Sequence, residues 1–168
     1  MAVSMYPISV PVFIKHLNGL AGCLKKAQAL YAEKKYDEAT LLSYRFYPDM
    51  FNFSRQIQAM SDHAKGCTAL LAGMEAPKYE DNEKSLADLI TRIEKTVGFL
   101  KSVKPAQIDG TEEKAISIKM RDRELNMKGI ELLLNRSLPN FYFHATTAYD
   151  ILRHNGVELA KRDFMGAA

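Results

Sequence analysis

The sequence predicts an all-α protein, a four-helix bundle with a crossover connection and a short β-hairpin between the third and fourth helices. Three observations support this prediction. Apolar side chains recur at helical spacing in four long stretches. Proline stands near the start of three of these stretches and glycine follows the end of two, as expected at helix boundaries. One segment between the third and fourth stretches alternates apolar and polar residues instead, which is typical of paired strands.

The first helix is expected over residues 9–32. Ser9 can cap its N-terminus, and Pro11 falls in the opening turn, where a missing backbone N–H costs little. The apolar residues at mostly helical spacing are Val10, Phe13, Ile14, Leu17, Leu20, Leu24 and Tyr31. Residues 33–47 have no such pattern, and we expect them to form a connection.

The second helix is expected over residues 48–72. Pro48 stands in its first turn, and the carboxylate of Asp49 is favourable near the positive end of the helix dipole. The apolar positions alternate steps of four and three, as in the seam of a bundle: Phe53, Ile57, Met60, Ala64, Cys67 and Leu71. Gly73 is a suitable residue to end this helix.

The third helix is expected over residues 82–102 and is amphipathic. Its inward positions are Leu86, Leu89, Ile90, Ile93, Val97 and Leu100. Its outward positions are Lys84, Asp88, Arg92, Glu94 and Lys95. We therefore expect this charged face, Arg92 included, to lie in solvent.

Residues 114–128 nearly alternate in polarity and predict the hairpin. The fourth helix is expected over residues 139–155, with Pro139 in its first turn and Gly156 after its end. We expect four antiparallel helices, and the long 101–137 segment favours the crossover topology. The residues expected in the core are Leu17, Ile57, Met60, Ile93, Val97, Ala148 and Leu152.

The composition is that of an ordinary globular protein and predicts a single domain over residues 1–168. Of the 168 residues, 47% are apolar and 26% charged, which excludes a collagen, a disordered tail and a disulfide scaffold. No stretch approaches the ~20 apolar residues of a membrane span, and the N-terminus does not resemble a secretion signal. Cys23 and Cys67 lack a CxxC spacing and fit a reduced, cytoplasmic protein. A net charge of +3 is too small to predict a nucleic-acid partner.

The segment 139–156 is dense in side chains that can form a small-molecule site. Aromatic rings supply apolar walls, and histidine, threonine, aspartate, arginine and asparagine supply polar points. The candidate ligand-binding residues are His144, Tyr149, Arg153, His154, Asn155 and Asp163. The same pattern also fits a packed core with a routine ion pair on the helix surface.

A weaker candidate is a metal site formed by His63 and His144, which can converge if the second and fourth helices face each other. A third ligand is lacking, because Ala148 occupies the position four residues after His144. The sequence contains no GxSxG, HExxH, GxxxxGK[ST] or GxGxxG motif. The position of Cys67 on the apolar seam predicts a core residue. Cys23 lies near two lysines and would have a depressed pKa if it were exposed.

The C-terminal tail contains Val157, Leu159 and Phe164, and we expect it to fold back onto the helices. One hypothesis is that Asp163 pairs with Arg153 or Lys161 and fixes the tail as a lid over the end that contains His144 and Tyr149. The other is a plain clasp that adds stability alone.

Three runs of the sequence resemble a domain-of-unknown-function family placed beside the DinB/YfiT-like helical bundles. They are FSRQIQAMSDHAKG (53–66), DNEKSLADLITRIEKTVGFL (81–100) and LPNFYFHATTAYDILRHNGVELAKRDFMG (138–166), so the resemblance covers most of the chain. It implies a DinB-like four-helix bundle that associates as a homodimer, and it implies no established activity. In the tail, Ala160 replaces a glycine that is usual in this family.

DinB-like relatives that bind metal place one histidine on the second helix and a pair, four residues apart, on the fourth. His63 and His144 match two of these positions, and Ala148 occupies the third, which gives a degenerate metal site. Our leading hypothesis is therefore a non-catalytic small-molecule-binding or interaction module that forms a homodimer, without a cofactor. The alternative is a metal-dependent thiol-transferase or hydrolase that holds zinc or nickel with His63, His144 and an unidentified acid.

Overall fold

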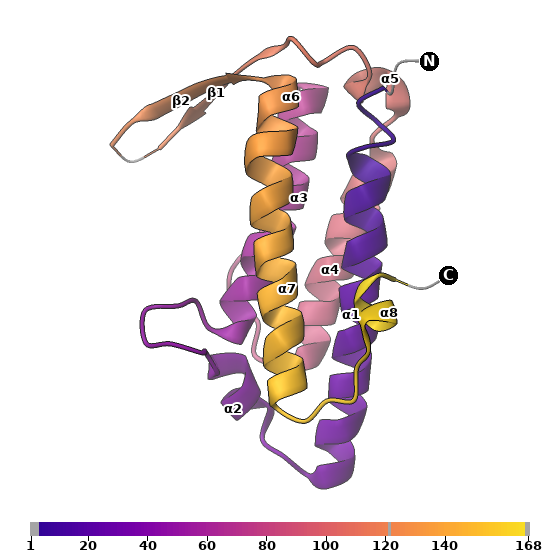
Figure 1. Ribbon diagram of the computed structural model, residues 1–168, viewed down its shortest axis with the longest axis vertical. Helices are drawn as coiled ribbons and strands as arrows, with labels where there is room; N and C mark the ends of the chain where they lie inside the picture. Colours follow the sequence, from indigo (N-terminus) through magenta and orange to yellow (C-terminus); the bar gives the residue numbers. More distant parts are fainter. Residues whose placement is uncertain (1–3, 121, 167–168) are drawn as a thin grey trace.

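Four long helices pack lengthwise around one apolar core in the computed structural model, which describes residues 4–120 and 122–166 (Figure 1). They are α1 (Val10–Lys34), α3 (Phe53–Ala72), α4 (Leu86–Ser102) and α7 (Leu138–His154). The predicted predominance of helix is confirmed, and so are the approximate positions of the four long helices. Every residue predicted to lie in the core is buried.

Two of the long helices begin later than predicted, because capping side chains define their starts. The Asn52 side chain accepts a hydrogen bond from the Arg55 backbone N–H at 3.0 Å, so α3 begins at Phe53 and not at residue 48. The Ser85 side chain caps α4 in the same way, by accepting from the backbone N–H of Asp88 at 3.1 Å. Capping of this kind satisfies backbone donors that have no partner within the helix.

Short elements connect the long helices. The segment expected to be a plain connection contains α2 (Glu38–Ser43), whose first turn is capped by the Asp37 carboxylate. The others are α5 (Pro105–Ile108), α6 (Gly129–Glu131) and α8 (Lys161–Phe164). Between α6 and α7 lies η1 (Leu132–Ser137), a stretch of π-helix, so helical structure begins well before the predicted residue 139. π-helical turns are rare and are found frequently at functional sites.

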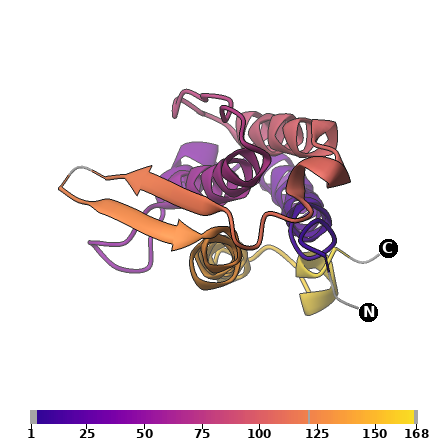
Figure 2. The ribbon, with the colours of Figure 1, turned by 90° about the horizontal axis from the view of Figure 1, so that it is seen from above.

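The predicted hairpin is confirmed as β1 (Ala115–Lys119) and β2 (Glu124–Lys128). The strands are antiparallel, with Ile116 opposite Met127 and Ile118 opposite Leu125. Figures 1 and 2 show the hairpin projecting from the bundle on the same side as the loop between α2 and α3. Position 121, in the predicted turn, lies outside the described residues.

The directions of the helices differ from the expected antiparallel order. In Figure 1, α1 and α7 run downward, whereas α3 and α4 run upward. The contacts agree, because Asp62 in the middle of α3 pairs with Arg92 in the middle of α4, at 3.0 Å. Near the end of α3, the Leu70 carbonyl accepts from Lys114, which follows α4 in the chain, at 2.9 Å. Two parallel neighbours in sequence require a connection that returns along the bundle, and residues 73–85 provide it. The 101–137 segment connects the end of α4 to the start of α7, and both of these lie at the same end of the molecule.

The C-terminal tail folds back as predicted and packs on α1 and α7. Val157 and Leu159 are buried, and the Phe164 ring lies 5.5 Å from the His16 ring and 5.6 Å from the Tyr149 ring, measured between centroids. A Cβ atom at Gly19 would lie 2.7 Å from the Phe164 carbonyl oxygen. The close approach of α8 to α1 therefore depends on a residue without a side chain.

Candidate functional site

His63 of α3 and His144 of α7 lie side by side. Their ring centroids are 5.7 Å apart and the two planes differ by 15°. Helices α3 and α7 pack against each other in opposite directions, so side chains in the middle of one meet those in the middle of the other. Of the candidate residues chosen from the sequence, these two are the pair that the fold brings together.

Gln56, which sequence reasoning missed, determines which ring nitrogen of His144 carries the proton. The Gln56 side-chain nitrogen donates to the Phe51 carbonyl at 3.0 Å, which leaves its oxygen toward His144. That oxygen lies 2.7 Å from His144 Nδ1. An amide oxygen can only accept, so Nδ1 carries the proton and the Nε2 lone pair of the neutral ring is free to accept or to ligate. Such support of a histidine is typical of metal ligands and of general bases.

Both imidazoles of the pair favour the neutral form. Burial, then the charge of His144 and that of Arg136, lower the pKa of His63 to about 4, against a small opposing effect of Asp62. Burial lowers the pKa of His144 as well, with a smaller contribution from Arg55. A neutral imidazole retains a lone pair, which is the form that binds a proton donor or a metal.

Arg136 is the second residue that the sequence did not single out. It lies in the π-helix η1, is half-buried, and makes no ion pair with another described residue. The π-helix η1 packs on α3, the helix that carries His63. Arg136, Asn140 and His144 follow one another at steps of four, so they share a face of the continuous helical stretch. We call Gln56, His63, Arg136 and His144 the imidazole site.

Two exposed aromatic rings border the imidazole site. Phe51 stacks on the His144 ring at 6.0 Å with an angle of 14°, and Phe143 meets the same ring edge-on at 5.3 Å. Both phenylalanines are about half exposed, Phe51 at 49% and Phe143 at 58%. Exposed aromatic side chains beside oriented polar groups are typical of sites that hold small organic molecules.

The other candidate residues on α7 point in different directions and do not join the imidazole site. Tyr149 packs on Phe164 of the tail. His154 packs against Tyr44 and Phe46, near α2. The Asn155 side chain donates back to the Ile151 carbonyl at 2.8 Å and closes the end of the helix.

The pairing of Asp163 that the lid hypothesis assumes does not form. Its carboxylate binds Lys26 of α1 at 2.8 Å and accepts from the Ala160 backbone N–H at 2.7 Å, with no bond to Arg153 or Lys161. Arg153 instead donates to the Leu159 carbonyl. The tail thus covers the α1 side of α7, whereas His144 faces α3. This arrangement contradicts the lid hypothesis and fits the clasp.

Removal of the Arg153 side chain should loosen this clasp. We expect Arg153→Ala to lose about 1 kcal/mol, the usual worth of a hydrogen bond, and so to melt ~2–4 °C lower. Differential scanning calorimetry measures this change. Arg162→Ala is the matched control, because Arg162 lies on the same tail, is exposed, and makes no ion pair with a described residue. Equal melting temperatures for the two variants would count against the clasp.

A metal centre of the kind found in DinB-like relatives does not fit the residues present. Among the described residues, no three histidine, cysteine, aspartate or glutamate side chains are grouped as a metal would require. Ala148, at the third position, is fully buried and has no ligating atom. Two imidazoles fall short of the three protein ligands of a catalytic zinc site.

Neither cysteine is an activated nucleophile. Cys23 is buried, so the exposure that a depressed pKa would require is lacking, and burial raises its pKa to about 11. Burial also raises the pKa of Cys67 to about 12. Both thiols are protonated at neutral pH and act as small core side chains.

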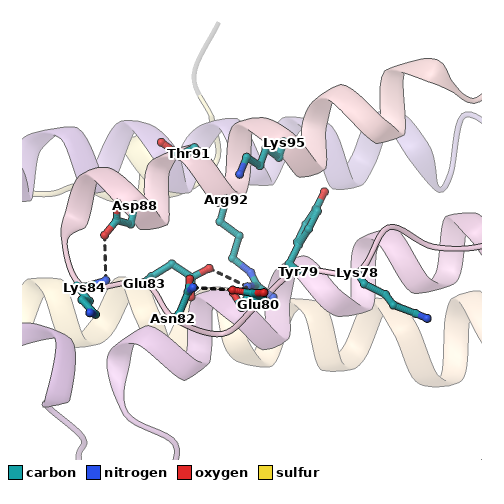
Figure 3. Close-up of a pocket in the computed structure, with 10 residues that line it drawn as sticks. All are labelled: Lys78, Tyr79, Glu80, Asn82, Glu83, Lys84, Asp88, Thr91, Arg92 and Lys95. Carbon is teal, nitrogen blue, oxygen red and sulfur yellow. Dashed lines mark hydrogen bonds and ion pairs between the residues drawn. The ribbon is translucent and has the colours of Figure 1, made fainter.

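A second polar cluster surrounds Arg92, which is buried rather than solvent-exposed as predicted (Figure 3). Its guanidinium binds Glu83 at 2.8 Å, Asp62 at 3.0 Å and Asp81 at 3.1 Å, and it lies 5.2 Å from the Tyr79 ring. Arg92, Glu83 and Tyr79, together with neighbouring polar and charged side chains that include Lys78, Lys84 and Lys95, line a surface cavity of about 560 Å³. Three of these partners belong to residues 73–85, so the cluster holds the returning connection against α3 and α4.

The family model for a domain of unknown function, DUF1993, matches residues 5–165. The chain belongs to this family. A crystal structure described as a DinB family member protein from Shewanella denitrificans is also similar, with 39% sequence identity and a TM-score of 0.86. The match covers 97% of this chain and 92% of that one. The fold of this DUF1993 protein is therefore DinB-like, as the resemblance implied. No curated protein matches it, and none of its described helices is long and apolar enough to cross a bilayer.

Acid should destabilise this DUF1993 protein through His63. Folding lowers the pKa of His63 from 6.5 to about 4, because the buried ring favours its neutral form. The folded state therefore keeps its full stability above pH 6.5 and loses stability as the pH falls toward 4, where the unfolded chain binds a proton more readily. Between about pH 7.5 and about pH 5, the free energy of unfolding should fall by about 2 kcal/mol on this account. Urea unfolding at the two pH values measures this fall. His63→Gln should lose less on acidification, and an equal loss in both proteins would contradict the prediction.

Proposed function

We propose that this DUF1993 protein is a non-catalytic binding protein whose small-molecule ligand lies at the imidazole site between α3 and α7. The observation that carries the proposal is the hydrogen-bonded series from the Phe51 carbonyl through Gln56 to His144. It fixes one tautomer and leaves Nε2 as an oriented acceptor beside a second neutral imidazole. A side chain that served the core alone would not need this orientation.

The surroundings of the two rings support the same proposal. The exposed rings of Phe51 and Phe143, one stacked on His144 and the other edge-on to it, offer apolar contact. The binding of a ligand there would cover aromatic surface that the isolated chain leaves in water, which is favourable. We assign no catalytic residue, because both cysteines are protonated and the metal ligand set is incomplete.

A thermal-shift screen with small organic acids, amines, sugars and nucleosides tests the proposal. We expect at least one compound class to raise the melting temperature of the wild type, and His144→Ala to abolish that shift. Gln56→Leu should weaken it, because His144 would lose the group that holds its tautomer. Arg153→Ala, which alters the tail, should keep the shift. If no compound stabilises the wild type, the proposal fails.

We further propose that the protein forms a homodimer. The loop between α2 and α3 carries three exposed aromatic side chains, Phe46, Tyr47 and Phe51, with exposed fractions of 42%, 65% and 49%. Exposed apolar side chains that gather in one patch mark protein interaction surfaces. Bundles commonly associate with two-fold symmetry. Light scattering at micromolar concentration should give twice the chain mass of 18.9 kDa. A mass equal to one chain would contradict the dimer, and Tyr47→Asp should shift a true dimer toward the monomer.

A further inference from the structure

We infer that the ligand of the imidazole site is a small anion that also carries a hydrogen-bond donor, and that a 2-hydroxycarboxylate is the simplest compound of this class. The inference rests on the proposed binding function and adds the chemical class of the ligand. It follows from what each polar group of the site can donate or accept.

Arg136 requires an acceptor. A guanidinium has five N–H donors and no acceptor, and it binds carboxylate or phosphate oxygens in preference to other partners. Asp62, which precedes His63 in the chain, and Asp81 are already paired with other cations. Asp62 holds Arg92 and Lys65, each at 3.0 Å, and Asp81 holds Arg55 and Arg92. Arg136 has no such partner among the described residues, although it is half-buried. An anionic ligand would supply the missing partner.

His144 requires a donor. Its Nδ1–H is used by Gln56, so the remaining ring nitrogen, Nε2, can only accept. A simple carboxylate at pH 7 has no proton to offer, whereas a hydroxyl group next to the carboxylate has one. His63 has no hydrogen bond with a described side chain, and as a neutral ring it can both donate and accept. The two histidines therefore favour a ligand that combines both kinds of group.

The spacing of these groups suits a small molecule. Arg136 and His144 lie two turns apart on one face of the helical stretch, about 12 Å along its axis. His63 contacts the His144 ring from α3, and η1, which carries Arg136, packs on the same helix. The long arginine side chain and the imidazoles can thus meet on a ligand of a few heavy atoms. A cationic ligand is disfavoured, because Arg136 would repel it.

Isothermal titration calorimetry of the full chain with three probes tests the class. The probes are glycolate, which has the anion and the donor, acetate, which lacks the donor, and ethylene glycol, which lacks the anion. We expect glycolate to bind, acetate to bind roughly 10-fold more weakly, and ethylene glycol not to bind measurably. Equal affinity for glycolate and acetate, or binding of ethylene glycol alone, would overturn the inference.

Two variants separate the roles of the residues. Arg136→Gln should weaken glycolate binding roughly 10-fold or more without loss of thermal stability, because it removes a cation that has no ion pair to lose. Arg123→Gln, in the distant hairpin turn, is the matched control and should bind glycolate as the wild type does. Unchanged binding by Arg136→Gln would refute the assignment of an anion.

The same titrations distinguish failure of this inference from failure of the proposed function. If a neutral or cationic compound binds and His144→Ala abolishes that binding, the site is real and the anion class is wrong. If no probe of any charge shows binding that depends on His144, the proposed function itself is wrong. If Arg136→Gln binds a cationic compound more tightly than the wild type does, Arg136 repels cations at the site, which supports the anion class.

Discussion

Arg92→Ala is expected to lower the free energy of unfolding by about 3–5 kcal/mol, one of the two largest effects we predict for a single substitution in this protein. The side chain is 3% exposed and binds three carboxylates. Two of these keep another cation after the substitution, since Asp62 retains Lys65 and Asp81 retains Arg55. Glu83 does not, and at 8% side-chain exposure it would be left as a buried, uncompensated charge.

The burial of Glu83 provides a rescue experiment. Arg92→Ala combined with Glu83→Gln should recover at least about 1 kcal/mol, because the amide costs less to bury than the unpaired carboxylate. Lys95→Ala is the matched control, as Lys95 is exposed and lies one turn farther along the same helix. Urea unfolding measures all three variants. A loss below about 1 kcal/mol for Arg92→Ala would show that the network adds no net stability, an outcome known for some buried ion pairs.

The burial of Arg92 also shows where helical periodicity stops being sufficient. The pattern of α4 correctly separates an apolar face from a charged one, and its apolar residues are buried as predicted. Periodicity assumes that the charged face meets water. Here α3 and α4 run in parallel, so residues 73–85 must return along the bundle, and they cover Arg92 on the outward face (Figure 3). The direction of a helix is not encoded in its own periodicity.

The sequence could predict only part of the candidate site, because the packing of the helices against one another decides which side chains meet. The second and fourth predicted helices suggested that His63 and His144 converge, and the fold places their rings together. Gln56 and Arg136 were missed because their roles depend on the register between α3 and α7 and on a π-helical turn, neither of which has a signal in one sequence. Tyr149, also chosen from the sequence, packs on Phe164 and does not join His144. Five residues beyond His144, it points about 140° away around the helix.

The second large effect is expected for Phe141→Ala, which should cost about 3–5 kcal/mol of unfolding free energy. The Phe141 ring is fully buried and meets the ring of Phe13 on α1 edge-on, with centroids 4.9 Å apart. Its removal would leave a cavity between α1 and α7, since neighbouring side chains fill such a space only partly. The loss can be measured by urea unfolding.

Phe143→Ala is the matched control, because it removes the same side chain two positions farther along α7, where the ring is 58% exposed. We expect it to change the unfolding free energy by less than about 0.5 kcal/mol, as for most surface substitutions. It should instead weaken ligand binding at the imidazole site, since Phe143 contacts the His144 ring. Phe141→Ala, if it is kept folded at low temperature, should retain that binding. The two phenylalanines thus separate the stability of α7 from its proposed function, and equal losses of stability in both variants would refute the division.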